Sequence, residues 1–391
     1  MHDVRPWFYC CHNEPDELCA LYKQRRYTDT GVNYRSPRAA GGRGDPHITT
    51  FDGLGYTFNG AGEFWLIKSD SQHNRLMAAQ ARMEPFGEKS ATVFTAFVLQ
   101  CANSSRVQIE KVPIRKVDVL VDGVPMELTS GNPLLFDVAF TEVQVTVQED
   151  LSAVSVAFAC GFTFQVDVSL EALSIFSTAE LKEHKTMGLL GVYDDNQAND
   201  LTDPEGQIIS ANSSLKTIHY NFGLKWLVKP SESLFSYTAG RSYEHYFKPQ
   251  FVPNFNLPNI SAAPLEAQEI CNQSTECLYD YMTTENRAIA SQTKSVSNQF
   301  IEAVEVFKRE VLTCPPLKNP QNGIFRADNF MPGSVATFSC LSGHTLTGNQ
   351  TITCTEEGFW TGSEPVCSSG ALLFQVGNLL MVILLLLSVF N

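Results

Sequence analysis

Basic residues are scarce in this 391-residue chain, which has 28 Lys and Arg against 42 Asp and Glu. The formal net charge is -14 at pH 7, and no basic stripe appears anywhere along the sequence. Nucleic-acid binding depends on clustered Lys and Arg that neutralise phosphates, so the composition argues against a nucleic-acid partner. The abundant carboxylates suit a hard cation such as calcium instead.

Motifs for catalysis on other molecules are also missing. The sequence contains no Gly-X-Ser-X-Gly elbow, no His-Glu-X-X-His pair and no phosphate-binding loop. A hydrolase needs a nucleophile, a base and an orienting group gathered in one cleft, and no such set is recognisable. We therefore expect a protein that is not an enzyme and keep a hydrolytic ectoenzyme as the weaker alternative.

Residues 1–20 lack the apolar run, preceded by basic residues, of a secretory signal peptide. The chain nevertheless has 11 cysteines and several Asn-X-Ser/Thr sequons, a combination typical of the oxidising secretory pathway. We therefore interpret the chain as a piece of a longer extracellular precursor. The predicted glycosylation sites are Asn103, Asn212, Asn259, Asn272 and Asn349.

The C-terminal residues 371–390 carry no charge, and roughly 20 apolar residues suffice to cross a bilayer as a helix. We expect a single-pass type I anchor that holds the folded part on the extracellular face of the plasma membrane. No Lys or Arg follows the span, however, and the small residues 368–370 precede it. A lipid-anchor attachment signal, exchanged for GPI, is therefore the alternative.

Four cysteines enclose residues 314–367, a stretch rich in Gly, Pro and Thr, and their spacing leaves three pairings open. The opening Cys314-Pro315-Pro316, the run Gly358-Phe359-Trp360 and the closing Pro365-Val366-Cys367 resemble a sushi (complement control) module. The resemblance implies bridges from Cys314 to Cys354 and from Cys340 to Cys367, with Trp360 packed between them. So small a module depends on such bridges for stability.

The centre of the chain is rich in β-type runs. Residues 44–67 alternate aromatic or aliphatic residues with Gly, Asn and Asp, which is typical of hairpins. Further strands are expected at 91–101, 117–121, 144–147, 152–160 and 162–168. We predict a mainly β, multidomain chain whose central sandwich ends near Trp226.

This central segment resembles a von Willebrand factor type D domain. The motifs are Gly44-Asp45-Pro46-His47, Thr50-Phe51-Asp52-Gly53 and, near the end, residues 188–194. We assign residues 41–229 to this β-sandwich-type domain. Cys101 and Cys160 are the cysteines inside it, so we expect them to pair.

Residues 194–200 pack oxygen-bearing side chains densely, as calcium loops do, although a solvated turn would read the same way. Carried onto this sequence, the type D resemblance implies structural calcium ligands. They are Asp52, Asp194, Asn199 and Asp200, with a carbonyl from Asn196. Val192 stands where many members have a ligating Asn, and Leu190 and Glu63 occupy positions that are often Cys.

The Asp45-Pro46 bond is chemically weak, because the Asp carboxyl can attack its own carbonyl and the proline nitrogen leaves readily. The type D resemblance implies self-cleavage here, with Asp45 as the internal nucleophile and His47 as a candidate proton donor. An ordinary turn before the first strand is the alternative. Arg43-Gly44-Asp45 also spells an integrin-binding tripeptide, a weaker interpretation.

The flanks of the type D segment differ. Residues 1–40 resemble the closing part of an AMOP domain, an adhesion-associated module. Residues 230–313 show apolar residues at helical spacing and are interpreted as a partly helical connector, in which Cys271 and Cys277 close a local loop. The remaining Cys10, Cys11 and Cys19 are odd in number, so their partners are expected in upstream sequence that this chain does not contain.

The order of modules, AMOP, type D, sushi and anchor, implies a cell-surface adhesion or receptor-like ectodomain that binds an extracellular protein or glycan. A GPI-anchored or secreted mucin-like structural protein is the alternative. The predicted anchor and the absent cysteines of the type D segment weigh against a secreted polymer.

Overall fold

The computed structural model falls into two compact units, one within Arg35–Arg309 and one within Glu310–Asn391. It describes residues 38–369, except for 70–76, 103, 114–115, 128–135, 138–142, 149, 159, 180–185, 257, 309–313, 328–329, 331–332 and 356–358. The predicted AMOP remnant, apart from its last residues, lies outside the described part of the chain. The predicted anchor at 371–390 lies outside it as well.

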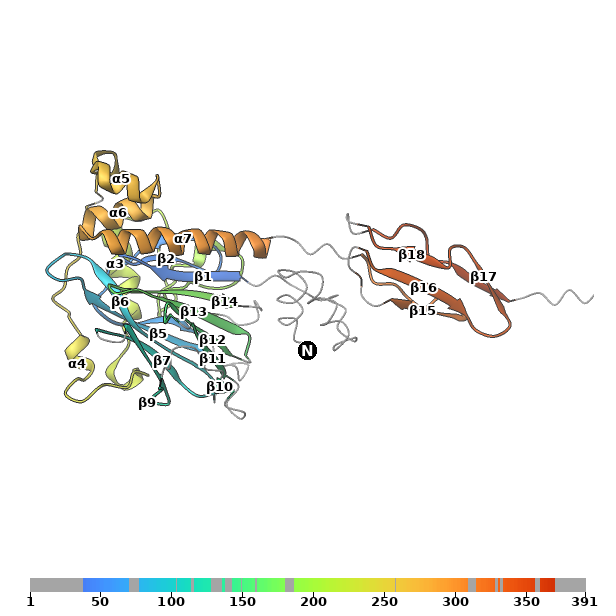
Figure 1. The fold of residues 1–391 in the computed structure, drawn as a ribbon, viewed down its shortest axis with the longest axis horizontal. Coiled ribbons are helices and arrows are strands. Elements are labelled where there is room, and N and C mark those ends of the chain that lie inside the picture. Colours follow the sequence, from blue (N-terminus) through green and yellow to red (C-terminus); the bar gives the residue numbers. More distant parts are fainter. Residues whose placement is uncertain are drawn as a thin grey trace, which may run out of the picture. The chain divides into compact units, whose positions relative to one another are not determined.

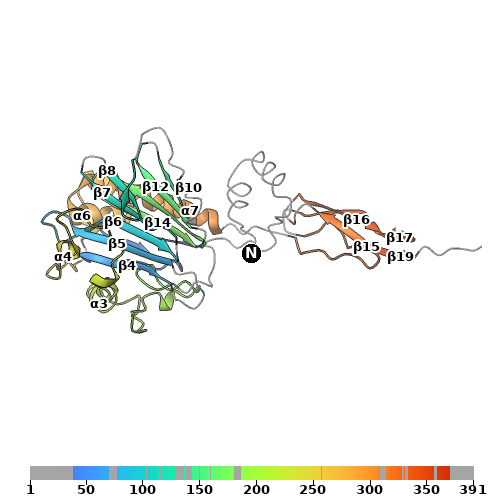
Figure 2. The same cartoon turned by 90° about the horizontal axis from the view of Figure 1, so that it is seen from below.

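A 14-stranded antiparallel sheet forms the body of the larger unit (Figure 1). Its strands fall into two halves, joined where Leu173 pairs with Phe94. In order across the sheet, the first half contains β10 (Phe136–Asp137), β11 (Val143–Val147), β12 (Ala153–Phe158), β13 (Phe162–Val168), β14 (Leu173–Ala179), β1 (Arg38–Arg43), β2 (His47–Thr49) and β3 (Gly55–Thr57). The second contains β4 (Gly62–Lys68), β5 (Met77–Pro85), β6 (Thr92–Cys101), β7 (Val107–Val112), β8 (Lys116–Val121) and β9 (Val124–Pro125) (Figure 2).

The two halves bury a common hydrophobic core. Phe162 and Phe164 of β13 belong to the same apolar cluster as Phe64 of β4 and Phe97 of β6, and all four side chains are fully buried. In β13 buried residues alternate with half-buried ones, because successive side chains of a strand point to opposite faces. Each large side chain buried in this way stabilises the fold by about 1.5–3 kcal/mol.

The mainly β prediction is confirmed, and β6, β8, β11, β12 and β13 lie within a residue or two of the expected runs. An isolated bridge from Phe64 to Leu227 lies at the expected end of this region near Trp226, but among the described residues the last strand of the sheet ends much earlier, at Ala179. Short helices follow instead, because Ser214 caps a helix whose Ile218 and Phe222 reach the core at helical spacing. They are η3 (Gln197–Asn199), α3 (Leu215–Asn221) and η4 (Gly223–Trp226).

The segment after the sheet is held to it by a buried ion-pair cluster. Arg82 of β5 lies 3.1 Å from both Glu63 and Glu110, and its guanidinium stacks 3.6 Å from the ring centre of Tyr246. Tyr237 adds hydrogen bonds to the Glu63 carboxylate. Glu63 therefore braces this region by charge pairing, at a position that is often Cys in the family it resembles. The segment contains η5 (Pro230–Glu232) and α4 (Tyr243–Tyr246).

Three helices complete the larger unit, and α7 runs alongside β1 (Figure 1). They are α5 (Leu265–Cys271), α6 (Thr275–Thr284) and α7 (Arg287–Lys308), after the single turn η6 (Ile260–Ala262). Ser274 caps α6 by accepting a hydrogen bond from the backbone N–H of Cys277. Glu285, at a φ of 52°, ends α6, and the Asn286 side chain then accepts the first N–H groups of α7. The two helices are therefore joined by a tight, well-capped turn.

The smaller unit contains two short sheets braced by disulfides. A three-stranded sheet is formed by β15 (Gly323–Ala327), β16 (Val335–Cys340) and β18 (Thr351–Thr353), and a pair by β17 (His344–Thr347) and β19 (Val366–Ser369). Its core holds Phe330 and Phe338, and Trp360 packs edge-on against Phe330. The indole N–H of Trp360 donates to the carbonyl of Pro315 at 2.8 Å. Trp360 is thus a packing residue of this small core.

Helices in the described part of the chain fall short of the length and apolarity that a bilayer span requires. The longest of them, α7, has acidic, basic and amide side chains along its 22 residues.

Candidate functional site

The Asp45-Pro46 bond lies at the tip of a β-hairpin. Arg43 of β1 pairs with His47 of β2, which leaves Gly44, Asp45 and Pro46 as the turn. Gly44 has a φ of 61°, a left-handed conformation that a glycine adopts without strain. β1 also pairs with β14, and β2 pairs with β3, so both sides of the hairpin are held in the sheet.

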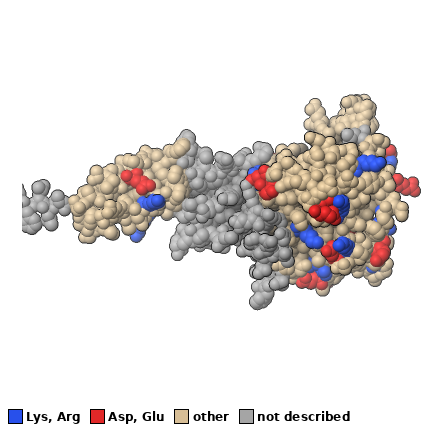
Figure 3. Space-filling model, turned by 180° about the vertical axis from the view of Figure 1, so that it is seen from behind, with Lys and Arg blue, Asp and Glu red and all other residues tan. Residues whose placement is uncertain are grey.

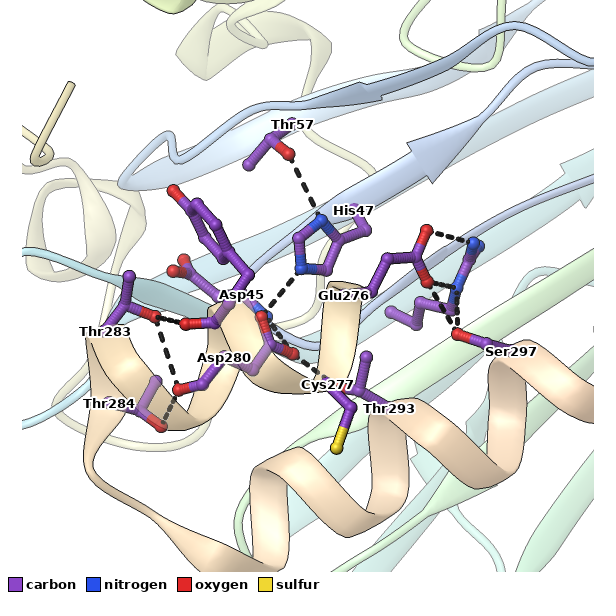
Figure 4. Close-up of polar contacts among 12 residues, drawn as sticks. Asp45, His47, Thr57, Glu276, Cys277, Asp280, Thr283, Thr284, Thr293 and Ser297 are labelled. Carbon is purple, nitrogen blue, oxygen red and sulfur yellow. Dashed lines mark hydrogen bonds and ion pairs between the residues drawn. The ribbon is translucent and has the colours of Figure 1, made fainter. Parts of the chain in front are cut away.

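Helix α6 places a carboxylate directly on this turn (Figure 4). Oδ1 of Asp280 lies 2.7 Å from Nε2 of His47, and Oδ2 accepts the backbone N–H of Asp45 at 3.3 Å. The hydroxyl of Thr293, on α7, donates to the same Oδ2 at 2.5 Å. The other ring nitrogen of His47 lies 3.1 Å from the hydroxyl of Thr57. Both nitrogens of the imidazole are therefore engaged, and Asp280 is fully buried.

A second ion pair lies beside the first. The guanidinium of Arg43 donates to both carboxylate oxygens of Glu276, at 2.6 and 2.8 Å, and to the hydroxyl of Ser297. Its side chain is 8% exposed and stacks over the ring of Phe300. Bidentate pairs of this kind are among the stronger polar contacts in proteins. The base of the hairpin turn is thus joined to both α6 and α7.

Asp45 is the one carboxylate of this group without a cation paired to it in the described structure. It is 1% exposed, and its Oδ1 has no hydrogen-bond partner among the described residues. Burial, and then the Asp280 carboxylate, raise the pKa of Asp45 to about 7, against smaller opposing effects of His47, Thr283 and Asn59. The carboxyl of Asp45 therefore retains its proton much closer to neutral pH than an exposed Asp does.

The charge of His47 is set by its acidic neighbours. Burial alone would lower the pKa of His47, but attraction and hydrogen bonding by Asp280 outweigh it, with help from Glu276, and the pKa is raised. Tyr279 of α6 packs edge-on against the ring at 5.1 Å. The site thus favours the protonated forms of both His47 and Asp45 relative to exposed side chains of the same types.

The integrin tripeptide suggested by residues 43–45 is not accessible in this fold. Arg43 is 6% exposed and Asp45 is 1% exposed. The Arg43 side chain is already occupied by Glu276 and Ser297. An integrin needs both side chains at the surface, so the folded hairpin excludes that interpretation.

The candidate calcium residues meet in one acidic loop. Oδ2 of Asp52 accepts the backbone N–H groups of Asp194, at 3.1 Å, and Asn196, at 2.8 Å. The amide of Asn199 donates to Asp194 at 2.8 Å. Asp200 accepts hydrogen bonds from the hydroxyl of Thr50 and the backbone N–H of Val192, and burial raises its pKa to about 6. The structure therefore brings the five sequence-predicted residues into one neighbourhood.

Two oxygen atoms of this loop have no partner. They are Oδ1 of Asp52 and Oδ1 of Asn199, both buried and without a hydrogen bond among the described residues. Carboxylate and amide oxygens are the donors that calcium prefers, so the donor set fits the ion. In the described part of the chain, however, no three His, Cys, Asp or Glu side chains are arranged to hold a metal unaided. A calcium ion here would need Asn199 and backbone oxygens as ligands.

Disulfides join Cys101 to Cys160, Cys271 to Cys277, Cys314 to Cys354 and Cys340 to Cys367. These are the four pairs expected above. Four of the sequon asparagines, Asn212, Asn259, Asn272 and Asn349, are exposed, and Asn103 lies outside the described residues. On the face shown in Figure 3, acidic and basic side chains of the described residues are interspersed rather than segregated.

Sequence reasoning missed the helical side of the Asp45-Pro46 turn. Residues 230–313 were interpreted as a packed connector, yet α6 and α7 supply Glu276, Asp280 and Thr293 to the turn. No motif marks these residues. The pattern offers a single hint, an acidic residue at 276 and another at 280, four apart on one helix face.

Comparison with known protein families matches three regions of the chain. Residues 41–207 match the von Willebrand factor type D domain, residues 258–306 the mucin-4-like C8-3 domain, and residues 314–367 the sushi repeat. The second match assigns the helical region to a family of its own, which the sequence analysis did not recognise.

Similar proteins share this combination over most of the chain. Sushi domain-containing protein 2 of Homo sapiens is 28% identical over 95% of this chain and 45% of its own length. Protein mesh of Bombyx mori is 30% identical over 92% of this chain and 24% of its own length. Mucin-4 of Mus musculus is 31% identical over 75% of this chain and 8% of its own length. The chain thus spans less than half of each of these relatives. It contains a von Willebrand factor type D domain and a sushi repeat, and it is similar to sushi domain-containing protein 2 over nearly all of its length.

Proposed function

We propose that the chain is part of a cell-surface adhesion or receptor-like ectodomain that binds an extracellular protein or glycan. The observation that carries this proposal is the combination of type D, C8-3 and sushi modules in one disulfide-bonded chain. None of the three matched families is one of enzymes. The mucin-4 relatives favour a mucin-like structural protein as the second candidate.

The sushi module offers exposed apolar contact residues. Leu341, Phe359 and Val366 are 53%, 67% and 63% exposed, although each is a large apolar side chain. Apolar and aromatic side chains at the surface are the usual anchors of binding interfaces. A ligand that docks on this module would bury at least one of them.

Binding is tested with fluorescent purified chain added to cells before and after treatment with sialidase, heparinase or trypsin. Loss of binding after a glycosidase indicates a glycan, and loss after trypsin alone indicates a protein. The Phe359→Ala variant should bind less than wild type, whereas Glu269→Gln, an exposed change on α5, should bind equally. If no tested cell type shows saturable binding of the chain, the receptor proposal is wrong.

We propose in addition that the chain cuts itself between Asp45 and Pro46. A carboxyl oxygen of Asp45 bonds to its own carbonyl carbon, and the bond from that carbon to the nitrogen of Pro46 breaks. The carboxyl proton ends on the proline nitrogen, and water then opens the cyclic anhydride to two carboxyls. A protonated, buried Asp45 supports this step because it supplies both the attacking oxygen and the proton.

Cleavage is tested on reducing gels of wild type and Asp45→Ala, with N-terminal sequencing of the larger product. Wild type should give two fragments, the second beginning at Pro46, and the variant a single species. One full-length species in both proteins would contradict self-cleavage.

Calcium at the loop of Asp52 and residues 194–200 is the third proposal. The unpartnered oxygens of Asp52 and Asn199 support it, since an ion bound there would satisfy both. Bound calcium would neutralise the repulsion between Asp52 and its acidic neighbours and brace the loop against β2 and β3.

A further inference from the structure

We infer that Asp280 of helix α6 is a positioning residue for cleavage at Asp45-Pro46, so that the bond is cut only after α6 and α7 have packed on the β1–β2 hairpin. The inference rests on the self-cleavage proposed above. It adds a requirement that the type D domain does not meet by itself, because Asp280 lies in the C8-3 region at 258–306.

The carboxylate of Asp280 contacts residues on both sides of the Asp45-Pro46 bond. Its Oδ2 holds the N–H of Asp45, the residue before the bond, and its Oδ1 holds the ring of His47, the second residue after it (Figure 4). Thr293 fixes the carboxylate itself through a hydrogen bond from α7. The turn is thereby held at two points that flank the reacting carbonyl.

The helices approach so closely that the turn has no room for a side chain at Gly44. A Cβ on Gly44 would overlap the carboxylate of Asp280 and the hydroxyl of Thr293. Glu276, on the same face of α6 as Asp280, binds Arg43 at the base of the turn. Three consecutive residues of the hairpin therefore contact the helices, and the turn geometry depends on them.

The contact also bears on the chemistry. Intramolecular attack requires the Asp45 side chain to be held over its own carbonyl, and such orientation can contribute orders of magnitude in rate. The negative charge of Asp280 opposes loss of the proton from the Asp45 carboxyl. That proton is the one that the leaving nitrogen of Pro46 needs. Asp280 is suited to both roles, and the type D domain has to acquire it from a segment 235 residues further along the chain.

The test is a pulse-chase measurement of cleavage in the full chain, comparing wild type with Asp280→Asn, Thr293→Val and Glu269→Gln. Asp280→Asn keeps the shape of the side chain and should slow cleavage by about 10- to 100-fold. Thr293→Val, which loses the hydrogen bond to Asp280, should slow it less. Glu269→Gln removes a charge from an exposed site on α5 and should cleave at the wild-type rate.

The pH profile separates positioning from a loss of fold. Asp280 raises the pKa of both Asp45 and His47, so Asp280→Asn should shift the pH profile of cleavage to lower pH. A variant that merely folded less would lose amplitude at an unchanged midpoint. The charged and titratable groups that face the turn are Arg43 and His47 from the hairpin, with Glu276, Tyr279 and Asp280 from α6.

The outcomes distinguish this inference from the cleavage proposal. If wild type is cleaved, and Asp280→Asn is cleaved at the same rate with the same pH midpoint, the inference is overturned and self-cleavage still stands. Uncleaved wild type overturns both. If Asp280→Asn is not secreted, Thr293→Val decides, and an unchanged rate in that variant also overturns the inference.

Discussion

Nε2 of His47 lies 2.7 Å from Oδ1 of Asp280, a residue 233 positions further along the chain. Neither side chain is more than 8% exposed. The pair joins the second strand of the type D domain to a helix of the C8-3 region, so the folding of one is coupled to the docking of the other. Paired charges buried in this way are costly to separate.

Stability should depend on pH through this pair. The pKa of His47 is raised in the folded chain, so its stabilising contribution is complete below the unfolded value, about 6.5, and is lost as pH rises through the folded value. We expect the Asp45→Ala chain, which lacks the proposed nucleophile, to need less urea for unfolding at about pH 8.5 than at about pH 6. In the double variant with His47→Gln, the difference in urea stability between the two pH values should become smaller. If the difference persists, His47 is not its cause.

Loss of Arg82 should be strongly destabilising. Its removal leaves Glu63 buried without a counter-charge, so Arg82→Met should lower the free energy of unfolding by about 3–5 kcal/mol. The control is Lys68→Met, which removes a surface ion pair with Glu232 and should cost about 0–1 kcal/mol. The measurement is equilibrium denaturation of the two variants. Equal losses of unfolding free energy in both would show that the Arg82 cluster does not brace the structure.

The fragments of a cleaved chain should stay together without a covalent bond across the cut. β1 remains hydrogen-bonded between β14 and β2 after cleavage, and Ala40 within it is fully buried. Residues 1–45 and 46–391 should therefore co-elute in native size-exclusion chromatography and separate in concentrated urea with reductant. Ala40→Asp should promote separation, whereas Arg38→Gln, an exposed change on β1, should not.

Calcium should stabilise the larger unit. An ion at 100 times its dissociation constant adds about 2.7 kcal/mol to the free energy of unfolding, so chelation should lower the melting temperature of wild type. Asp194→Asn should melt at the same temperature with and without calcium. The matched control is Asp118→Asn, on β8 and away from the loop. Calcium should still raise the melting temperature of this variant. An identical response in both variants would place the ion elsewhere.

Local pattern was enough to predict much of the architecture. Period-2 alternation marks β11 and β13, because one face of each strand is buried against the core. β5, β7 and β14 were missed. Met77–Pro85 and Val107–Val112 contain Gln80, Arg82 and Gln108, buried polar residues with partners in residues 228–247. Glu110 is buried against Arg82. A strand buried by such partners does not show a simple alternation in its own sequence.

The sequence by itself indicated the type D and sushi modules, the local loop of Cys271 and Cys277 and the weak Asp45-Pro46 bond, because each depends on residues that are neighbours in the chain or carry a recognisable motif. The sushi cysteine pairs were implied by the family resemblance. Only the tertiary structure decided what surrounds that bond. Asp280, Glu276 and Thr293 reach the turn because α6 and α7 pack over the hairpin. Packing between segments more than 200 residues apart leaves no periodic trace in either of them, so the helical half of the site became visible only in the folded chain.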